Sequence, residues 1–337
     1  MRNSKKLNSF YLELVINYNN CYRTFIRIIT IKMHIIENYV QNLMANLPKK
    51  KEPENINLIL DGGIFNGSYL IGALYFLREM EKQNYLTINK ISSCSIGSVC
   101  AVLYQIDALD LMPELYNILL KQFKETRHFH AFKSCLDKIK IRINSTSSKL
   151  KLNNVLYITY YDIKKGKKII KSKYKNVDDL LDAVYKSCFV PFIADGNMVY
   201  KNRYCDGVNP YIFPFETNRK TLYLDLFGSD KIHYMLSVKN EKNNFHRILA
   251  GLLDIHLFYI KQNSTQMCSY VNQWSLYQTI HNRILKWIVE RVIFYVVYIS
   301  YYLKKYIPSE LYEHIIFKIV SKIITELYIV FIDYFCF

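Results

Sequence analysis

Glycine is scarce in this 337-residue chain, and the places where it occurs constrain the fold more than any other sequence feature. Average usage near 7% predicts about 24 glycines in a chain of this length, whereas the sequence has 10. Six of them lie in three short segments: Gly62, Gly63, Gly67, Gly72, Gly97 and Gly207. Because glycine is rare elsewhere, this clustering indicates backbone positions that tolerate no side chain.

Two of the glycine segments join a short apolar strand to a helix. In the first, a strand over Ile56–Leu60 leads through a turn at Gly62–Gly67 into a helix over Ser68–Lys82. In the second, a strand over Lys90–Cys94 leads into a helix over Gly97–Ile106. A strand, a tight turn and a helix in succession, found twice, favour βαβ units in a parallel sheet and therefore the α/β class.

The remaining pattern divides the chain into three parts. A helix predicted over 23–46 and a linker rich in Pro and Lys make up residues 1–54, residues 55–230 carry the α/β pattern, and residues 231–337 are mainly helical and aromatic-rich. Within the middle part the pattern predicts a helix over Leu111–Lys124, a hairpin of Leu150–Ile163 and Lys167–Tyr174, a helix from Asn176 to about Cys188, and strands over Met198–Tyr204 and Leu222–Leu226.

The three glycine segments together carry the residue types that acyl transfer needs. Ser95 stands at the second strand-to-helix corner, where a nucleophilic serine needs small residues on both sides, as in the G-x-S-x-G elbow. Here the flanking positions hold Ser93 and Gly97. A serine hydroxyl is a poor nucleophile until a base takes its proton. Asp206, followed by Gly207 at the end of a predicted strand, is the candidate base.

The glycine turn after the first strand suits the remaining requirement of acyl transfer. A developing oxyanion needs backbone N–H donors in a fixed array, and a glycine turn before a helix offers them. Such a turn also suits a phosphate group. A P-loop, however, needs Gly-Lys-Ser/Thr, and Asn66-Gly67-Ser68 has no lysine, so the sequence does not favour nucleotide binding.

In content and order these motifs resemble those of the patatin-like phospholipases, over roughly residues 55–230. The segment Gly67–Leu74 is similar to that family's G-x-Y-x-x-G-x-L, and Ser187–Phe192 is similar to the helix and proline that precede the family's catalytic aspartate. The resemblance implies a three-layer α/β fold with a central, mostly parallel sheet, here with helical N- and C-terminal extensions. It also implies a lipid acyl hydrolase of the phospholipase A type, a serine esterase with a Ser/Asp dyad, no catalytic histidine, no metal and no organic cofactor.

Carried over by position, the resemblance assigns the nucleophile to Ser95, the base to Asp206, and the oxyanion donors to the backbone of Gly62, Gly63 and Ile64. The residues that support the motifs are Gly67, Ser93, Gly97 and Gly207.

Four positions depart from the family's pattern. Ser93 replaces the first glycine of the elbow, and Ile64 stands where the family usually has a third glycine. Asn66 stands where Lys or Arg is usual, and Val208 replaces a small residue after the Asp-Gly pair. None of these removes a reacting atom. They leave open a second interpretation, a weak or inactive protein of the same fold that binds membrane surfaces.

The formal net charge of +17 indicates a polyanionic partner, either nucleic acid or an anionic membrane surface. Part of this charge has another explanation, because the abundance of Lys, Asn, Ile and Tyr is typical of an A+T-rich genome. No nucleic-acid-binding motif is found. We therefore expect peripheral contact with an anionic membrane surface, with membrane lipid or phospholipid as the substrate.

Eight cysteines without a CxxC motif or paired spacing suggest neither a zinc site nor a disulfide framework, so reduced thiols in the cytoplasm are expected. The N-terminal stretch is a poor signal-peptide core. The longest apolar run, Val292–Leu303, has about 12 residues, fewer than the ~17–25 of a membrane-spanning helix. We expect a cytoplasmic protein that is peripherally associated with membranes.

Two further features admit more than one interpretation. His233, His246 and His256 follow Asp206 and would allow a Ser…Asp…His order, but the position of the serine about 30 residues after the glycine turn fits the patatin pattern better. The apolar segment Ile284–Leu303, which ends in Lys304-Lys305, is either packed on the core or lies in the headgroup layer of a membrane.

Overall fold

The computed structural model describes residues 34–48, 52–145, 152–228, 231–235 and 237–306, and six single positions between 319 and 334. The chain divides into two compact units, Met1–Asn46 and Leu47–Phe337. In the first unit the described residues form a helix over 34–44. This helix is part of the predicted helix 23–46, whose first residues lie outside the described ones, as does most of the predicted helical tail after 306.

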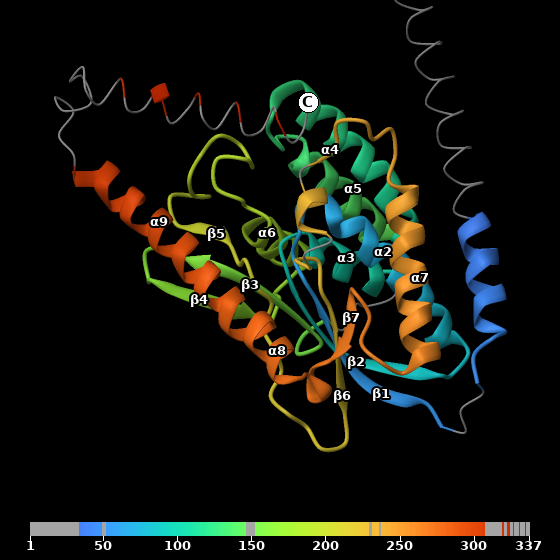
Figure 1. Cartoon of the computed structure of the whole chain (residues 1–337). Coiled ribbons are helices and arrows are strands. Elements are labelled where there is room, and N and C mark those ends of the chain that lie inside the picture. The colour runs from blue at the N-terminus through green and yellow to red at the C-terminus, as the bar shows by residue number, and fades with distance from the viewer. Residues whose placement is uncertain are drawn as a thin grey trace, which may run out of the picture. The chain divides into compact units, whose positions relative to one another are not determined.

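Seven strands of the second unit form one mixed sheet (Figure 1). The strands are β1 (Glu54–Leu60), β2 (Leu86–Cys94), β3 (Leu156–Asp162), β4 (Lys167–Lys171), β5 (Tyr204–Asp206), β6 (Lys220–Leu224) and β7 (Cys268–Tyr270). Their order is β4-β3-β2-β1-β6-β7, with β5 also paired to β3. The four central strands are parallel, whereas β4, β5 and β7 pair antiparallel. The predicted α/β class with a parallel central sheet is confirmed.

Helices cover both faces of this sheet. The α-helices are α2 (Gly67–Lys82), α3 (Ile96–Gln105), α4 (Met112–Thr126), α5 (Phe132–Ser145), α6 (Val177–Ser187), α7 (Phe245–Lys261), α8 (Leu276–Thr279) and α9 (Lys286–Tyr306), with the π-helix η5 (Ile280–Leu285) joining the last two. Successive residues of β3 point to different helices: the ammonium of Lys186 in α6 lies over the ring of Tyr160, and the ring of Phe294 in α9 packs on Tyr161. The sheet therefore lies between two helical layers.

Most predicted elements are found within a few residues of their expected bounds. The hairpin of β3 and β4 is confirmed, and Asn176 caps α6 by accepting the backbone N–H of Asp179 at 2.8 Å. Two elements were not predicted: α5, and β7, which is too short to leave a periodic pattern. The strand predicted over Met198–Tyr204 is wrong, because residues 201–203 form a turn and only Tyr204–Asp206 pairs with β3.

Two glycines let helices α2 and α7 pack with their backbones in contact (Figure 1). A Cβ atom on Gly72 of α2 would lie 1.8 Å from the carbonyl oxygen of Ile248 in α7. A Cβ atom on Gly251 of α7 would lie 1.9 Å from the carbonyl oxygen of Tyr69 in α2. This reciprocal contact explains why two of the few glycines occur inside helices, where glycine is otherwise unfavourable.

The close crossing predicts the effect of Gly251→Ala. The added methyl group must push the two helices apart, so we expect the free energy of unfolding to fall by about 1–3 kcal/mol, as for other overpacked cores. Ala250→Val, one residue away on the exposed side of α7, is the matched control and should cost much less. Urea denaturation of both variants checks this, and an unchanged stability of Gly251→Ala would contradict the close crossing.

Candidate active site

Strand β3 brings Ser95 and Asp206 together through its register. Cys94, the last residue of β2, lies opposite Thr159 in a parallel pairing. Asp206, the last residue of β5, lies opposite the next residue, Tyr160, in an antiparallel pairing. Because β4 occupies the other edge of β3, β2 and β5 meet end to end on one edge. The two residues predicted as nucleophile and base, which are 111 positions apart in the sequence, therefore become neighbours.

The backbone at Ser95 forms the sharp corner that the sequence predicts. Its φ of +48° and ψ of −133° fall in a region that non-glycine residues rarely adopt, at a cost of about 1–3 kcal/mol. A buried serine holds this conformation: the N–H of Ser95 donates to Oγ of Ser187 at 2.9 Å. The hydroxyl of Ser187 in turn donates to the carbonyl of Thr159 at 2.7 Å. Ser187 is thus a positioning residue for the candidate nucleophile.

Asp206 is buried and fixed through its backbone and one carboxylate oxygen. Its N–H donates to the carbonyl of Phe189 at 2.9 Å, and its Oδ1 accepts the N–H of Val208 at 2.7 Å. Burial raises the pKa of Asp206 to about 6, against the opposing effects of the Ser95 hydroxyl, the Val208 amide and Lys168. A carboxyl group with this pKa is largely ionised at neutral pH and still basic enough to take a proton.

The hydroxyl of Ser95 is near enough to this carboxylate to lower its pKa. The two groups are near, but not in, direct hydrogen-bond geometry, and within the described part of the chain Oδ2 of Asp206 has no hydrogen-bond partner. Catalytic hydrogen bonds are often long before a substrate is bound. A buried carboxylate oxygen beside a serine hydroxyl is therefore placed to accept the proton of that hydroxyl.

The glycine turn offers two of the three amides that were predicted as oxyanion donors. The N–H of Gly62 is engaged in this structure, because it donates to Oδ1 of Asp61 at 2.9 Å. The amides of Gly63 and Ile64 donate to no other residue in the described ranges. The amide of Ile96, at the start of α3 and next to Ser95, is a further donor of this kind that the sequence analysis did not name.

Three small residues let the motifs approach one another. A Cβ atom on Gly97 would lie 2.5 Å from the carbonyl oxygen of Asp61, and one on Gly207 would lie 2.3 Å from that of Thr159. A Cβ atom on Gly67 would lie 2.3 Å from the side chain of Ile96. Ser93 is buried and donates to a carbonyl of β3, so this departure from glycine is accommodated.

Two of the other departures coincide with strained backbone. Ile64 has a φ of +47° and Val208 a φ of +56°. Glycine adopts this left-handed region freely, whereas β-branched residues adopt it only under strong constraint. The structure thus requires a glycine-like backbone at both positions, and the side chains present raise the energy of the loops on either side of Ser95.

The fourth departure, Asn66, contacts a cationic side chain of helix α7. Arg247 of α7 is fully buried, and its Nη1 donates to Oδ1 of Asn66 at 2.7 Å. The same guanidinium pairs with Glu241, with Nη2 2.6 Å from Oε1. A positive charge therefore lies beside position 66, where the patatin-like pattern usually has Lys or Arg.

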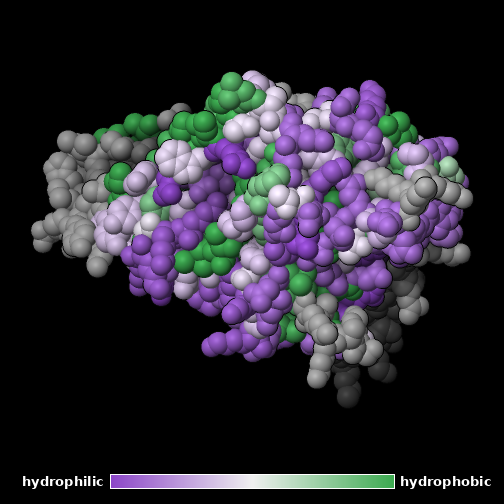
Figure 2. Space-filling model, turned by 90° about the horizontal axis from the view of Figure 1, so that it is seen from below, coloured by the Kyte–Doolittle hydropathy of each residue, from purple (hydrophilic) through white to green (hydrophobic). Residues whose placement is uncertain are grey.

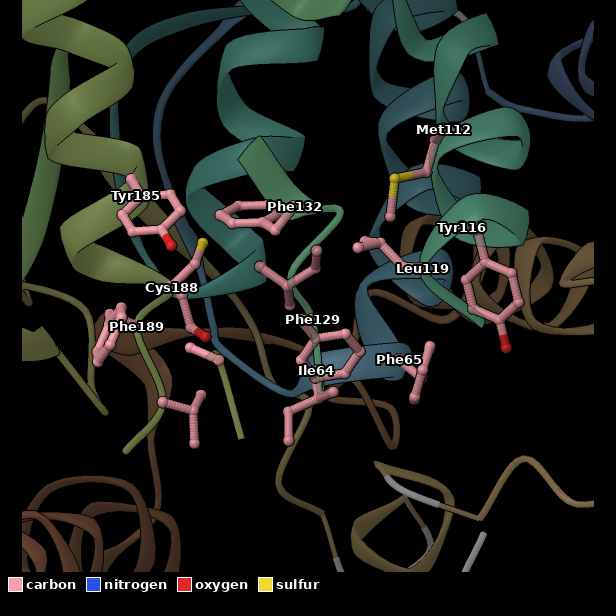
Figure 3. Close-up of a pocket in the computed structure, with 14 residues that line it drawn as sticks. Ile64, Phe65, Met112, Tyr116, Leu119, Phe129, Phe132, Tyr185, Cys188 and Phe189 are labelled. Atoms are coloured by element: carbon pink, nitrogen blue, oxygen red, sulfur yellow. The ribbon is translucent and has the colours of Figure 1, made fainter. Parts of the chain in front are cut away.

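An apolar pocket opens beside Ser95. Ser95, Ile64 and Ile96 line it, and the space it encloses is about 60 Å³. Figure 3 shows side chains from several elements pointing into it, among them those of Phe129 and Phe132. No charged residue is found among the described residues of its lining. A lining of apolar and aromatic side chains with few polar groups is typical of a site for an apolar ligand.

A buried ion cluster stabilises the glycine turn. Lys286, the first residue of α9, places its Nζ 2.7 Å from Oδ2 of Asp61 and 2.8 Å from Oδ1 of Asp225, and it also donates to the hydroxyl of Tyr223 at 2.9 Å. Burial raises the pKa of Asp61. The pKa of Lys286 is also raised, because the two carboxylates outweigh the lowering effect of burial. Asp61 in turn accepts the N–H of Gly62, so Lys286 helps to fix the turn that carries the candidate oxyanion donors.

The same helix also holds the loop that follows Asp206. Nδ2 of Asn209 donates to the carbonyl of Lys286 at 2.8 Å and to Oε2 of Glu290 at 2.7 Å. Glu290 pairs with Lys168 of β4 at 3.0 Å. Lys286 and Glu290, one helical turn apart, therefore bind the loops next to both halves of the site, which no local sequence signal indicated.

His246 and His256, which follow Asp206 in the sequence, do not line the pocket. His256 packs against the ring of Phe76, and His246 lies 3.2 Å from Glu241. Among the described residues, no cluster of His, Cys, Asp and Glu side chains could hold a metal ion.

The chain matches no protein-family model, and a search of curated proteins finds no match.

The ion cluster predicts that Lys286→Met lowers the free energy of unfolding by about 3–5 kcal/mol near pH 8, because two buried carboxylates lose their cation. Near pH 5 the loss should shrink, since Asp61 already has a raised pKa and can bind a proton instead. Lys140→Met, which removes an exposed ion pair with Asp178, is the control and should have little effect. Equal losses in the two variants, measured by urea denaturation, would contradict this role.

Proposed function

We propose that this chain is a lipid acyl hydrolase of the patatin-like phospholipase type, with Ser95 as nucleophile and Asp206 as base. The observation that carries the proposal is that β3 holds the Ser95 corner next to the buried Asp206, with Ser95 lining an apolar pocket. A hydroxyl, an acceptor for its proton and a site for an apolar chain are what ester hydrolysis of a lipid needs.

In the first half of the proposed reaction, Oγ of Ser95 attacks the ester carbonyl carbon as Asp206 takes the hydroxyl proton. The carbonyl oxygen becomes an oxyanion, which the amides of Gly63, Ile64 and Ile96 are available to bind. When the tetrahedral intermediate collapses, the ester C–O bond breaks and the alcohol leaves with the proton from Asp206. The acyl group remains on Ser95 as an ester.

In the second half, Asp206 takes a proton from a water molecule, and the resulting hydroxide attacks the acyl carbon. A second tetrahedral intermediate forms against the same amides. Its collapse releases the fatty acid and returns the proton from Asp206 to Oγ of Ser95. The dyad is then restored, and every proton has passed through a single carboxyl group.

The pocket supports an acyl chain as the group bound beside Ser95. Its lining includes four phenylalanine side chains, with Met112 and Leu119 on α4. An anionic headgroup would lose its hydration there without gaining a charged partner, at a large cost in free energy. A hydrocarbon chain gains from the burial of its surface, at roughly 25 cal/mol per Å². The headgroup is thus expected to stay outside the pocket.

A fluorophosphonate that labels active serines tests the proposal directly. We expect the native protein to be labelled and to release fatty acid from phospholipid vesicles. In Ser95→Ala and in Asp206→Asn, labelling should be lost and fatty-acid release should fall by a factor of at least about 10³. Ser134→Ala, which changes an exposed serine of α5, is the control and should keep both activities. Fatty-acid release by Ser95→Ala would exclude the assigned nucleophile. Vesicle binding without labelling would favour the non-catalytic alternative.

The raised pKa of Asp206 predicts the pH dependence of the reaction. Asp206 must be ionised to accept the serine proton, and its pKa is about 6. We therefore expect kcat/KM to fall about tenfold for each pH unit below that value and to level off above about pH 7. Lys168→Gln removes a charge that lowers this pKa, so its acid limb should move to higher pH, whereas Lys140→Gln should leave it in place. A flat profile from pH 5 to 8 would contradict the role of Asp206.

A further inference from the structure

Helix α9 buries charged residues and exposes apolar ones, which is the reverse of an ordinary surface helix. The buried side includes Lys286 and Glu290, followed at helical spacing by Phe294 and Val297. Every exposed residue between 287 and 299 is apolar or aromatic: Trp287, Ile288, Val289, Val292, Ile293, Tyr295, Val296 and Ile299. A helix that faces water normally places its charges outward, so this face is suited to a different environment.

The apolar surface continues onto the segment before α9. Leu276 and Tyr277 of α8 are 79% and 76% exposed, and Ile280, Ile284 and Leu285 of η5 are exposed as well. Figure 2 shows hydrophobic side chains gathered mainly in the left half of the face in view, the side on which α9 lies in Figure 1. We call the exposed residues of 276–299 the outer face of α8–α9. Apart from Arg283, the residues of this face are apolar or aromatic, and they form a longer run than the scattered apolar residues of an ordinary protein surface.

The charges around the outer face favour a lipid surface as its occupant. Arg283 and Arg291 lie over the rings of Trp274 and Trp287, and the sequence continues after the apolar stretch with Lys304 and Lys305. Cationic residues beside Trp and Tyr on an apolar helix face are typical of helices that lie at a membrane interface. A second copy of the chain carries the same net charge of +17, so electrostatic repulsion opposes its approach. An anionic bilayer is attracted to the same charge.

Within the described ranges no helix has both the length and the apolar character that a membrane span requires. The inward charges of α9 are held in the ion cluster and the contacts with Asn209, so the helix can enter the headgroup layer without exposing them to lipid. A helix fixed in this way presents a preformed apolar face.

We propose that α8–α9 is the membrane-docking surface of this protein and that it binds anionic phospholipid bilayers through Trp287, Val292 and Val296 at its centre. The docking itself is independent of catalysis. Its role, the delivery of the site to aggregated substrate, rests on the proposed function. Because Lys286 and Glu290 hold the loops of the site from the same helix, docking fixes the position of the site relative to the bilayer surface.

Docking is tested with full-length protein that carries Ser95→Ala, so that no lipid is consumed. With vesicles of phosphatidylcholine and phosphatidylserine we expect co-sedimentation that weakens as salt is raised. Val292→Glu combined with Val296→Glu should weaken binding at least about tenfold, because two charges would have to enter the apolar layer. Ile141→Glu, at an exposed apolar position of α5, is the matched control and should bind as the parent does.

The fluorescence of Trp287 gives a second measurement. With Trp274→Phe in place, Trp287 is the one remaining tryptophan of the sequence, and its emission should shift to the blue and be quenched by brominated lipid when vesicles are added. Unchanged binding by the double glutamate variant would overturn the proposal, as would a dimer that this variant converts to a monomer. Vesicle binding by the native protein without release of fatty acid would contradict only the proposed function.

Discussion

The geometry of the candidate site depends on strand β3, which pairs with both β2 and β5 along one edge. Thr159 and Tyr160 of β3 are consecutive, yet the first pairs with the end of β2 and the second with the end of β5. The corner after β2 carries Ser95 and the end of β5 carries Asp206, so the distance between them is set by backbone pairing rather than by flexible side chains. Ser187 and Phe189 add hydrogen bonds to both backbones. A site built on strand ends in this way is more precise than one built on loops.

A second constraint comes from charge in the interior. Asp61, Asp225 and Lys286 are buried together, and Glu290 is buried with Lys168 beside it. Removing one partner from such a cluster leaves an uncompensated charge, which costs far more than the intact pair contributes. The C-terminal helix is therefore part of the folded body that carries the site, and its position follows from charge pairing. Its outer face takes no part in this charge pairing.

The sequence predicts the parts of this structure that depend on local chemistry. The strands and helices around the glycines follow from apolar spacing, and Gly97 and Gly207 are glycines because backbone carbonyls lie where their side chains would be. Pairings between distant residues could not be predicted. Lys286 is 225 positions from Asp61, and a lysine in a helical, aromatic-rich segment carries no sign of its partner. The engagement of the Gly62 amide by Asp61 likewise depends on a rotamer that no pattern specifies.

The ion cluster also orders events during synthesis of the chain. The glycine turn and the Ser95 corner leave the ribosome early, whereas Lys286 follows 225 residues after Asp61. Until that lysine emerges, Asp61 and Asp225 have no buried cation, and the turn that they support lacks its native electrostatics. A nascent polypeptide that already contains Ser95 and Asp206 thus lacks the buried cation beneath the glycine turn until residue 286 has been added.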